Sequence, residues 1–340
     1  MRRRGPPGGA PDGAPEGALL PDEPAALCER TRMASRSNLR GLAVLVPALL
    51  LAAAGSGAPQ DGPGAAQVAA TMPAEEQASQ AQKQLLRGME LYTAGKLVEA
   101  RAELSGALLS WQLEGDQAAH ALKALTELAD KTLLSPTVCE GDPYAYTYTI
   151  RQGDLLNRVV KSEKVYVSPE FILKVNGLAD ARGLRAGQQI KMVRGPVHAV
   201  IYKQAFTMDL YLQRDEQPRA FLNRIRVGLG KANGTPEGLW RVSGKVAAAP
   251  WTAPPDHPLR GKVIRPGEPM YPLGKDGLWI ALEGSDQNTQ PRKGYGIHGT
   301  DDPSSIGRAE SSGCVRLADE DIRLAFWLFC EKLSTVQIRP

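Results

Sequence analysis

The stretch GYGIHGTDDPSSIGRAESSGCVRL, residues 294–317, holds one histidine, His298, and one cysteine, Cys314. The segment between them is rich in Gly, Ser and Asp and has no helical or strand periodicity. A thiol is a modest nucleophile at neutral pH, and a neighbouring imidazole that takes its proton activates it. The stretch therefore predicts a Cys–His pair for acyl transfer. Gly313 lets the backbone approach a substrate closely, and the N–H groups around it are candidate donors to an oxyanion.

On both sides of this stretch the sequence predicts strands separated by Gly- and Pro-containing turns. In the strand over 221–230, apolar residues alternate with Arg and Gly, as in a half-buried strand. A helix is expected from Asp319, with Ile322, Phe326, Phe329 and Leu333 along one face, and a final strand follows it. Residues 247–275 are Pro-rich and predict a long loop. The predicted strands are 198–204, 206–212, 221–230, 234–242, 277–283 and 335–338.

Residues 197–340 resemble the L,D-transpeptidase (YkuD-type) catalytic domain, a mostly β fold with a C-terminal helix. The family signature, His-Gly-Thr followed by Ser-x-Gly-Cys-(Ile/Val)-Arg, falls on residues 298–300 and 311–316, and the stretch TPEGLWRV also matches. The residue before the signature Gly is often His in relatives and is Ser312 here.

The resemblance implies a role for each residue of the signature. Cys314 would be the acylated nucleophile, and His298 would act first as base and then as acid. The backbone carbonyl of Gly299 or the hydroxyl of Ser311 would orient the imidazole. Arg316 would hold a substrate carboxylate or brace the loop, since a guanidinium can grip a carboxylate with two hydrogen bonds.

The family cleaves the amide between the third residue of a peptidoglycan stem and the following D-Ala, and keeps the stem as a thioester. An amine of a second stem then gives a cross-link, whereas water would make the enzyme an L,D-carboxypeptidase. A non-catalytic wall-binding protein and a papain-like peptidase are further alternatives. The papain order, with the Cys early and the His far downstream, is the reverse of the order here.

Several other residues carry weaker signals. Asp301 and Asp302 could ligate a metal beside His298, but the surrounding ligand spacing favours a solvated loop. Neither a metal nor an organic cofactor is implied. Cys330 is expected to be buried and inert within the last helix. Three tryptophans could stack on a substrate, although packing in the core is the expected role of each. They are Trp240, Trp251 and Trp279.

Residues 146–194 predict a strand, two helices and a second strand (βααβ) in under 50 residues. Ser168-Pro169 starts the second helix, with Ser as N-cap and Pro at the first helical position. Asn176-Gly177 ends it. The pattern resembles the LysM domain, a glycan-binding α/β module. The resemblance implies that five residues contact N-acetylated sugars: Gly153, Asp154, Leu155, Asn176 and Gly177.

The N-terminal part is interpreted as a leader and a helical region. Residues 1–73 lack periodicity and predict a disordered leader. Within them, 33–58 has the layout of a signal peptide or membrane anchor, and Met33 is a candidate translation start. Residues 74–138 predict a small helical hairpin, of which 88–108 is similar to one tetratricopeptide unit.

Composition and charge restrict the partners. Lys+Arg is 41 and Asp+Glu is 37, and the charges nearly balance once the Arg-rich residues 1–40 are set aside. No basic stripe remains, so a nucleic-acid partner is not expected. The four cysteines form no CxxC pair and are too few for a disulfide scaffold. The two resemblances and the signal-like segment 33–58 imply an exported cell-envelope protein that acts on peptidoglycan stems and glycan strands, touching the membrane only through an N-terminal anchor.

Overall fold

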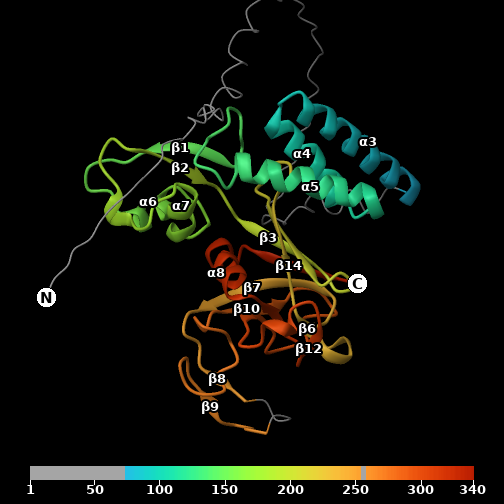
Figure 1. The fold of residues 1–340 in the computed structure, drawn as a ribbon, viewed down its shortest axis with the longest axis vertical. Coiled ribbons are helices and arrows are strands. Elements are labelled where there is room, and N and C mark those ends of the chain that lie inside the picture. Colours follow the sequence, from blue (N-terminus) through green and yellow to red (C-terminus); the bar gives the residue numbers. More distant parts are fainter. Residues whose placement is uncertain (1–72, 254–257) are drawn as a thin grey trace, which may run out of the picture. The chain divides into compact units, whose positions relative to one another are not determined.

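A computed structural model describes residues 73–253 and 258–340 (Figure 1). The leader, its proposed signal at 33–58 and Cys28 lie outside the described residues. None of the described helices is both long and apolar enough to cross a membrane.

The first described region has three helices, one more than a hairpin: α3 (Ala74–Thr93), α4 (Leu97–Leu108) and α5 (Gly115–Thr132). Gly95, at φ +74°, forms the tight turn between α3 and α4. Gly88 lets these two helices approach closely, because a Cβ there would lie 2.6 Å from Leu104 Cγ. The apolar cluster between the helices also includes Phe221, whose backbone N–H donates to Ser105 Oγ at 2.9 Å. The helices therefore pack on strand β5 (Ala220–Arg226) through shared side chains.

The second region consists of β1 (Ala145–Thr149), α6 (Leu156–Ser162), α7 (Pro169–Val175), the 3₁₀ turn η2 (Ala181–Gly183) and β2 (Gln189–Val193). β1 and β2 pair antiparallel. Ser168 caps α7 by accepting from Phe171 N, and Gly177 follows the helix at φ +65°. Buried Lys191 of β2 donates through Nζ to the carbonyls of Ser135 and Thr137 at 2.9 and 2.7 Å. This ammonium ties β2 to the segment that follows α5.

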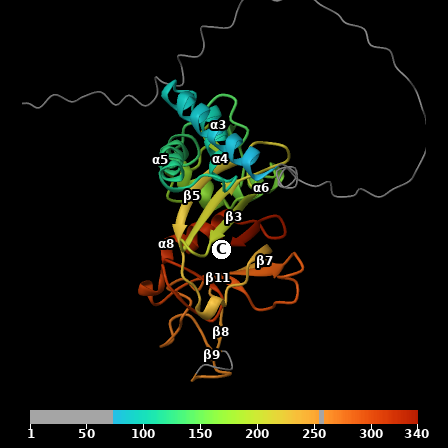
Figure 2. The same ribbon diagram turned by 90° about the vertical axis from the view of Figure 1, so that its right-hand side faces the viewer.

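The third region is built on an eight-stranded sheet in the order β13-β11-β10-β7-β14-β3-β4-β5. Most neighbours are antiparallel, but β11 pairs parallel with β13 and β3 parallel with β14. Helix α8 (Asp319–Leu328) follows β13. Figure 2 shows β3, β5, β7 and β11 together with α8. The sheet strands are β3 (Val197–Tyr202), β4 (Thr207–Leu212), β5 (Ala220–Arg226), β7 (Gly238–Val246), β10 (Trp279–Gly284), β11 (Gly296–Gly299), β13 (Val315–Leu317) and β14 (Thr335–Arg339).

Two short ladders lie outside this sheet. β6 (Leu229–Gly230) pairs with β12 (Ala309–Ser311), and β8 (Trp251–Thr252) pairs with β9 (Val263–Ile264). Two 3₁₀ turns, η3 (Lys231–Asn233) and η4 (Pro303–Ser305), complete the fold. The expected long loop over 247–275 thus carries the β8–β9 hairpin.

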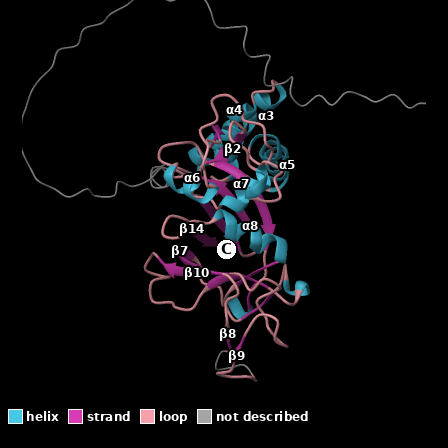
Figure 3. Cartoon of the chain, turned by 90° about the vertical axis from the view of Figure 1, so that its left-hand side faces the viewer, coloured by secondary structure: helices cyan, strands magenta, loops and turns pink. Residues whose placement is uncertain are grey.

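One apolar core continues from the second region into the sheet. It joins Phe171 and Ile172 of α7 to Trp240, Ile297 and Val315 of the sheet. Helices α7 and α8 contact each other, and Ser168 N donates to Trp327 O at 2.7 Å (Figure 3). The second region is therefore packed on the sheet that carries the candidate site.

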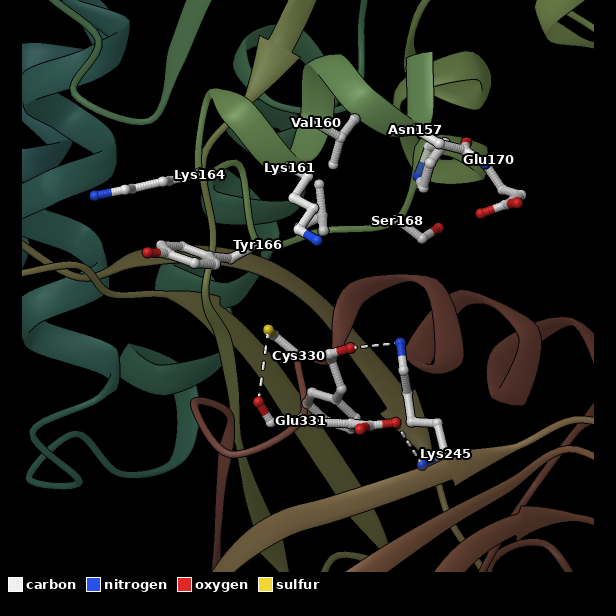
Figure 4. Close-up of a pocket in the computed structure, with 13 residues that line it drawn as sticks. Asn157, Val160, Lys161, Lys164, Tyr166, Ser168, Glu170, Lys245, Cys330 and Glu331 are labelled. Atoms are coloured by element: carbon white, nitrogen blue, oxygen red, sulfur yellow. Dashed lines mark hydrogen bonds between the residues drawn. The ribbon is translucent and has the colours of Figure 1, made fainter. Parts of the chain in front are cut away.

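The C-terminal helix is shorter than the sequence predicts. It ends at Leu328, so Phe329 and Leu333 are not helical, and Leu333 is exposed. The placement of Cys330 within this helix, and its expected burial, are wrong. Cys330 lies in the following turn, is half-buried, and lines a groove of about 500 Å³ between α6–α7 and the ends of β7 and α8 (Figure 4). Neither Cys314 nor His298 lines this groove.

Candidate active site

His298 lies on β11, between β10 and β13, and is 7% exposed. Its Nδ1 lies 2.6 Å from the carbonyl oxygen of Gly299. A carbonyl oxygen can only accept, so Nδ1 carries the proton and Nε2 carries the lone pair. This is the tautomer that a base acting through Nε2 requires. Of the two expected acceptors for the imidazole, the structure places Gly299 O in that position.

Burial sets the charge state of this imidazole. Burial lowers the pKa of His298 to about 4, against the opposing effect of the hydrogen bond to Gly299. Arg316, opposite His298 in the β11–β13 ladder, further disfavours the imidazolium. His298 is therefore neutral at pH 7 and able to accept a proton.

Cys314 immediately precedes β13, which runs parallel to β11. Its sulfur lies 3.8 Å from Gly294 O and receives a backbone hydrogen bond from Gly296. Gly296 and His298 are two residues apart on β11, which places their Cα atoms about 7 Å apart along the strand. Within the described residues no hydrogen bond joins Sγ to His298. The Cys314 sulfur thus contacts β11 at Gly296, two residues before the position that carries His298.

Burial raises the pKa of the Cys314 thiol, and the Gly296 hydrogen bond and Arg316 only partly offset this effect. With a lowered pKa on His298 as well, the resting pair is a neutral thiol and a neutral imidazole.

The loop before Cys314 is held by hydroxyl groups. Ser311 Oγ donates to Cys314 O at 2.6 Å and accepts from Gly313 N at 3.1 Å, so it braces the loop and does not orient the imidazole. Gly313 has φ +137°, and a Cβ there would lie 2.9 Å from Gly234 O. Buried Thr235 donates to Gly313 O at 2.9 Å and accepts from Gly230 N at 2.8 Å.

Arg316 is half-buried. Its backbone N–H donates to Gly228 O at 2.8 Å, and its carbonyl oxygen accepts from Gly228 N at 2.9 Å. Its guanidinium forms no ion pair within residues 73–253 and 258–340. The hydrogen bond from the Ser304 hydroxyl is the main reason that the pKa of Asp302 is lowered, and the charge of Arg316 adds to this effect. The guanidinium is therefore a cation beside Cys314 with capacity to bind an anion.

Asp302 has a local structural role. Its Oδ1 accepts from Ser304 N at 3.0 Å and caps the turn η4, while Asp301 is exposed. These contacts belong to a solvated turn beside the end of β11.

A polar groove of about 360 Å³ adjoins the Cys314 loop. Tyr295 and Gly234 line it, and both also lie within 3 Å of the position that a Cβ on Gly313 would take. Lys203 and Glu237, which form a 3.0 Å ion pair, line the same groove, as does Arg292. This groove is therefore lined mainly by polar and charged side chains and lies next to the loop that carries Cys314.

Of the five residues predicted to contact glycan, some are exposed and others hold the local structure through hydrogen bonds. Gly153 is exposed and Leu155 is 54% exposed, next to the start of α6. Asp154 accepts from Arg151 N and from the Tyr148 hydroxyl, and its side chain holds the turn. The backbone hydrogen bond from Arg151 is the main reason that the pKa of Asp154 is lowered. Asn176 bridges α7 and β2 through Ile172 O and both backbone groups of Lys191, and Gly177 follows it.

Residues 196–338 match the family model of YkuD, the L,D-transpeptidase catalytic domain. We call this segment the YkuD domain. The match covers less than half of the chain and includes the β3–β14 sheet, His298 and Cys314. The family acts on peptidoglycan stem peptides.

Two curated relatives that match the chain carry L,D-transpeptidase names. The Bacillus subtilis relative YkuD, which carries an L,D-transpeptidase name, is 28% identical over 52% of this chain and 88% of its own. YqjB of the same organism is 34% identical over 28% of this chain, and the chain spans 48% of its length. The solved Mycobacterium tuberculosis L,D-transpeptidase 1 is 14% identical, with 46% of this chain and 67% of that chain covered and a TM-score of 0.29.

Sequence reasoning missed two residues of the site. Thr235 lies within the TPEGLWRV stretch but was not singled out, because its partner Gly313 is 78 residues away. Trp279 was expected to pack in the core, and it stacks on His298 with ring centroids 5.3 Å apart. By contrast, Trp240 is fully buried in the core.

Proposed function

We propose that this chain is a peptidoglycan L,D-transpeptidase that forms cross-links through a thioester on Cys314. The observation that carries the proposal is that His298, with Nδ1 protonated and Nε2 left as base, lies on the same strand, β11, whose Gly296 donates to the Cys314 sulfur. The match of residues 196–338 to the YkuD family supports the same reaction class.

In the first step, Cys314 Sγ attacks the carbonyl carbon between the third stem residue and D-Ala while His298 Nε2 takes the thiol proton. The developing oxyanion is stabilised by backbone N–H groups at the Gly313–Cys314 loop. The C–N bond then breaks, the imidazolium returns the proton to the leaving amine, and D-Ala departs.

In the second step, an amine of another stem attacks the thioester and His298 accepts its proton. The C–S bond breaks, the new amide forms the cross-link, and the proton returns to the Cys314 sulfur. The unpaired guanidinium of Arg316 would hold a stem carboxylate during both steps.

The remaining parts of the proposal concern location. Residues 146–194 would act as a LysM module that tethers the enzyme to wall glycan and raises its local concentration at the substrate. The exposed Leu155 and the open turn at Gly153 support a contact with sugar there. Residues 33–58 would direct export to the cell envelope, where peptidoglycan lies.

Covalent capture by a carbapenem tests the nucleophile. Purified protein is incubated with imipenem and its mass is measured, with Cys314→Ala as the test variant. Cys330→Ala is the matched control, because Cys330 is the other half-buried thiol of the YkuD domain. Adduct on wild type and Cys330→Ala but not on Cys314→Ala is expected. A folded wild type without adduct would favour a non-catalytic wall-binding protein.

Muropeptide analysis tests the reaction outcome. Tetrapeptide muropeptides are incubated with wild type and Cys314→Ala, and dimers are counted against tripeptides. Dimers that depend on Cys314 are expected. Tripeptides alone would assign the chain as an L,D-carboxypeptidase instead.

A further inference from the structure

Trp279 is the first residue of β10 and lies directly opposite His298 in the β10–β11 ladder. The indole and imidazole rings are stacked, with centroids 5.3 Å apart and planes 10° from parallel. A near-parallel pair at this separation has the offset geometry that aromatic rings prefer. The contact therefore covers one face of the imidazole.

The same indole also covers Gly296. A Cβ on Gly296 would lie 2.5 Å from Trp279 Cζ2 and 2.7 Å from Cε2, so no larger residue fits beneath the ring. Gly296 is the residue whose backbone donates to the Cys314 sulfur. Trp279 thus lies across both β11 positions that serve the site, one carrying the base and one facing the nucleophile.

We propose that Trp279 is a positioning residue of the acyl-transfer site, which fixes the plane of the His298 imidazole and keeps water from its face. The hydrogen bond from Nδ1 to Gly299 O holds one edge of the ring, and the indole holds the face. Together these contacts fix the orientation of the ring, so the lone pair of Nε2 points in a single direction. This inference rests on the proposed function, because a fixed base matters only if His298 moves protons.

A purely packing role makes a different prediction. On its other side Trp279 packs against a small apolar cluster that includes Ile264 and Leu273. Loss of this packing alone would lower stability without changing the titration of His298. The charged group that acts on the pKa of His298 is Arg316 on the β13 side, while Trp279 on the β10 side carries no charge.

The test compares Trp279→Leu, which removes the aromatic face, with Trp279→Phe, which keeps it. Val246→Ala is the matched control, because Val246 pairs with Trp279 on its β7 side and is 47% exposed. The rate of imipenem acylation is measured from pH 3.5 to 8, and the His298 imidazole is titrated by NMR in ¹³C-histidine-labelled protein.

Trp279→Leu should slow acylation about fivefold to tenfold, the size expected for one aromatic contact. In this variant the midpoint of the acidic limb of the pH–rate profile should rise from about pH 4 towards 6.5, the ordinary pKa of histidine. The pKa of His298 measured by NMR should rise in the same way, because water reaches the ring. Trp279→Phe should restore both, and Val246→Ala should leave both unchanged.

An unshifted His298 titration in Trp279→Leu would overturn the inference, whatever the rate. Equal loss of rate in the Leu and Phe variants, with a lower Tm and no shift, would assign Trp279 to packing alone. If Trp279→Leu does not fold, Trp279→Met takes its place. A wild type that never acylates would refute the proposed function, and the NMR titration would still decide the role of Trp279.

Discussion

Replacing Thr235 by Val should remove the hydrogen bonds that join the loop before Cys314 to the turn over residues 230–235. The Thr235 hydroxyl accepts from Gly230 N at 2.8 Å and donates to Gly313 O at 2.9 Å, and the side chain is buried. Val has nearly the same shape without the hydroxyl. Both backbone groups would then lose their partner in a place that solvent does not reach.

A buried backbone group without a partner costs about 1–3 kcal/mol, so the two together should destabilise the fold by about 2–6 kcal/mol. Part of this cost would be relieved by movement of Gly313, which carries the next residue, Cys314, with it. A displacement of about 1 Å at a reacting atom costs on the order of a hundredfold in rate. We expect acylation to fall about tenfold to hundredfold although nucleophile and base are both intact.

The assay pairs thermal unfolding with the rate of covalent capture by imipenem, followed by mass spectrometry. Thr235→Ser is the control, because it keeps the hydroxyl and loses only a methyl group. It should stay near wild type in both measurements. Wild-type Tm and acylation rate in Thr235→Val would refute the reasoning that this hydroxyl holds the loop.

Three further predictions follow from buried groups. Burial lowers the pKa of both His198 and His298 to about 4, so the unfolded chain binds protons between pH 6.5 and 4 that the folded chain does not. Stability should therefore fall as pH drops through this range, and a Tm constant from pH 7 to 4 would contradict it. Arg101→Met should cost about 3–5 kcal/mol in unfolding free energy, because the buried Asp142 carboxylate, paired with Arg101 at 2.8 Å, would lose its cation and keep the hydrogen bond from Tyr144 N. The double variant with Asp142→Leu should recover much of that loss if the pairing argument holds. Gly313→Ala should add about 1–3 kcal/mol of strain at φ +137° and slow acylation; an unchanged rate would count against the close approach to Gly234 O.

The strands of the YkuD domain were largely predictable, since alternation and turn residues are local signals. One strand shows the limit. Phe221 and Ile225 are expected on the same face, yet Phe221 packs with the helices and Ile225 with the main core. A register shift between β4 and β5 at Leu210/Tyr211 accounts for this change of face. A bulge is set by pairing with another strand, so the alternation within β5 does not reveal it.

The same distinction applies to the site. His298 and Cys314 could be selected because each lies in a short motif with its glycines and serines. The contacts of Thr235 and Trp279 could not, because they join positions brought together only by sheet order. The length of the last helix was overestimated for a similar reason: Phe329 continues the apolar spacing but is buried in extended backbone after α8.

The packing of Phe221 and Lys191 has a consequence for how this chain can be divided. A fragment starting at residue 196 would retain every candidate active-site residue but leave the Phe221 ring, now fully buried, facing water. A fragment starting at residue 140 would additionally strip the Lys191 ammonium of the carbonyls of Ser135 and Thr137. The helices before the eight-stranded sheet thus act as its covering, and the shortest fragment that keeps these contacts should begin near residue 73.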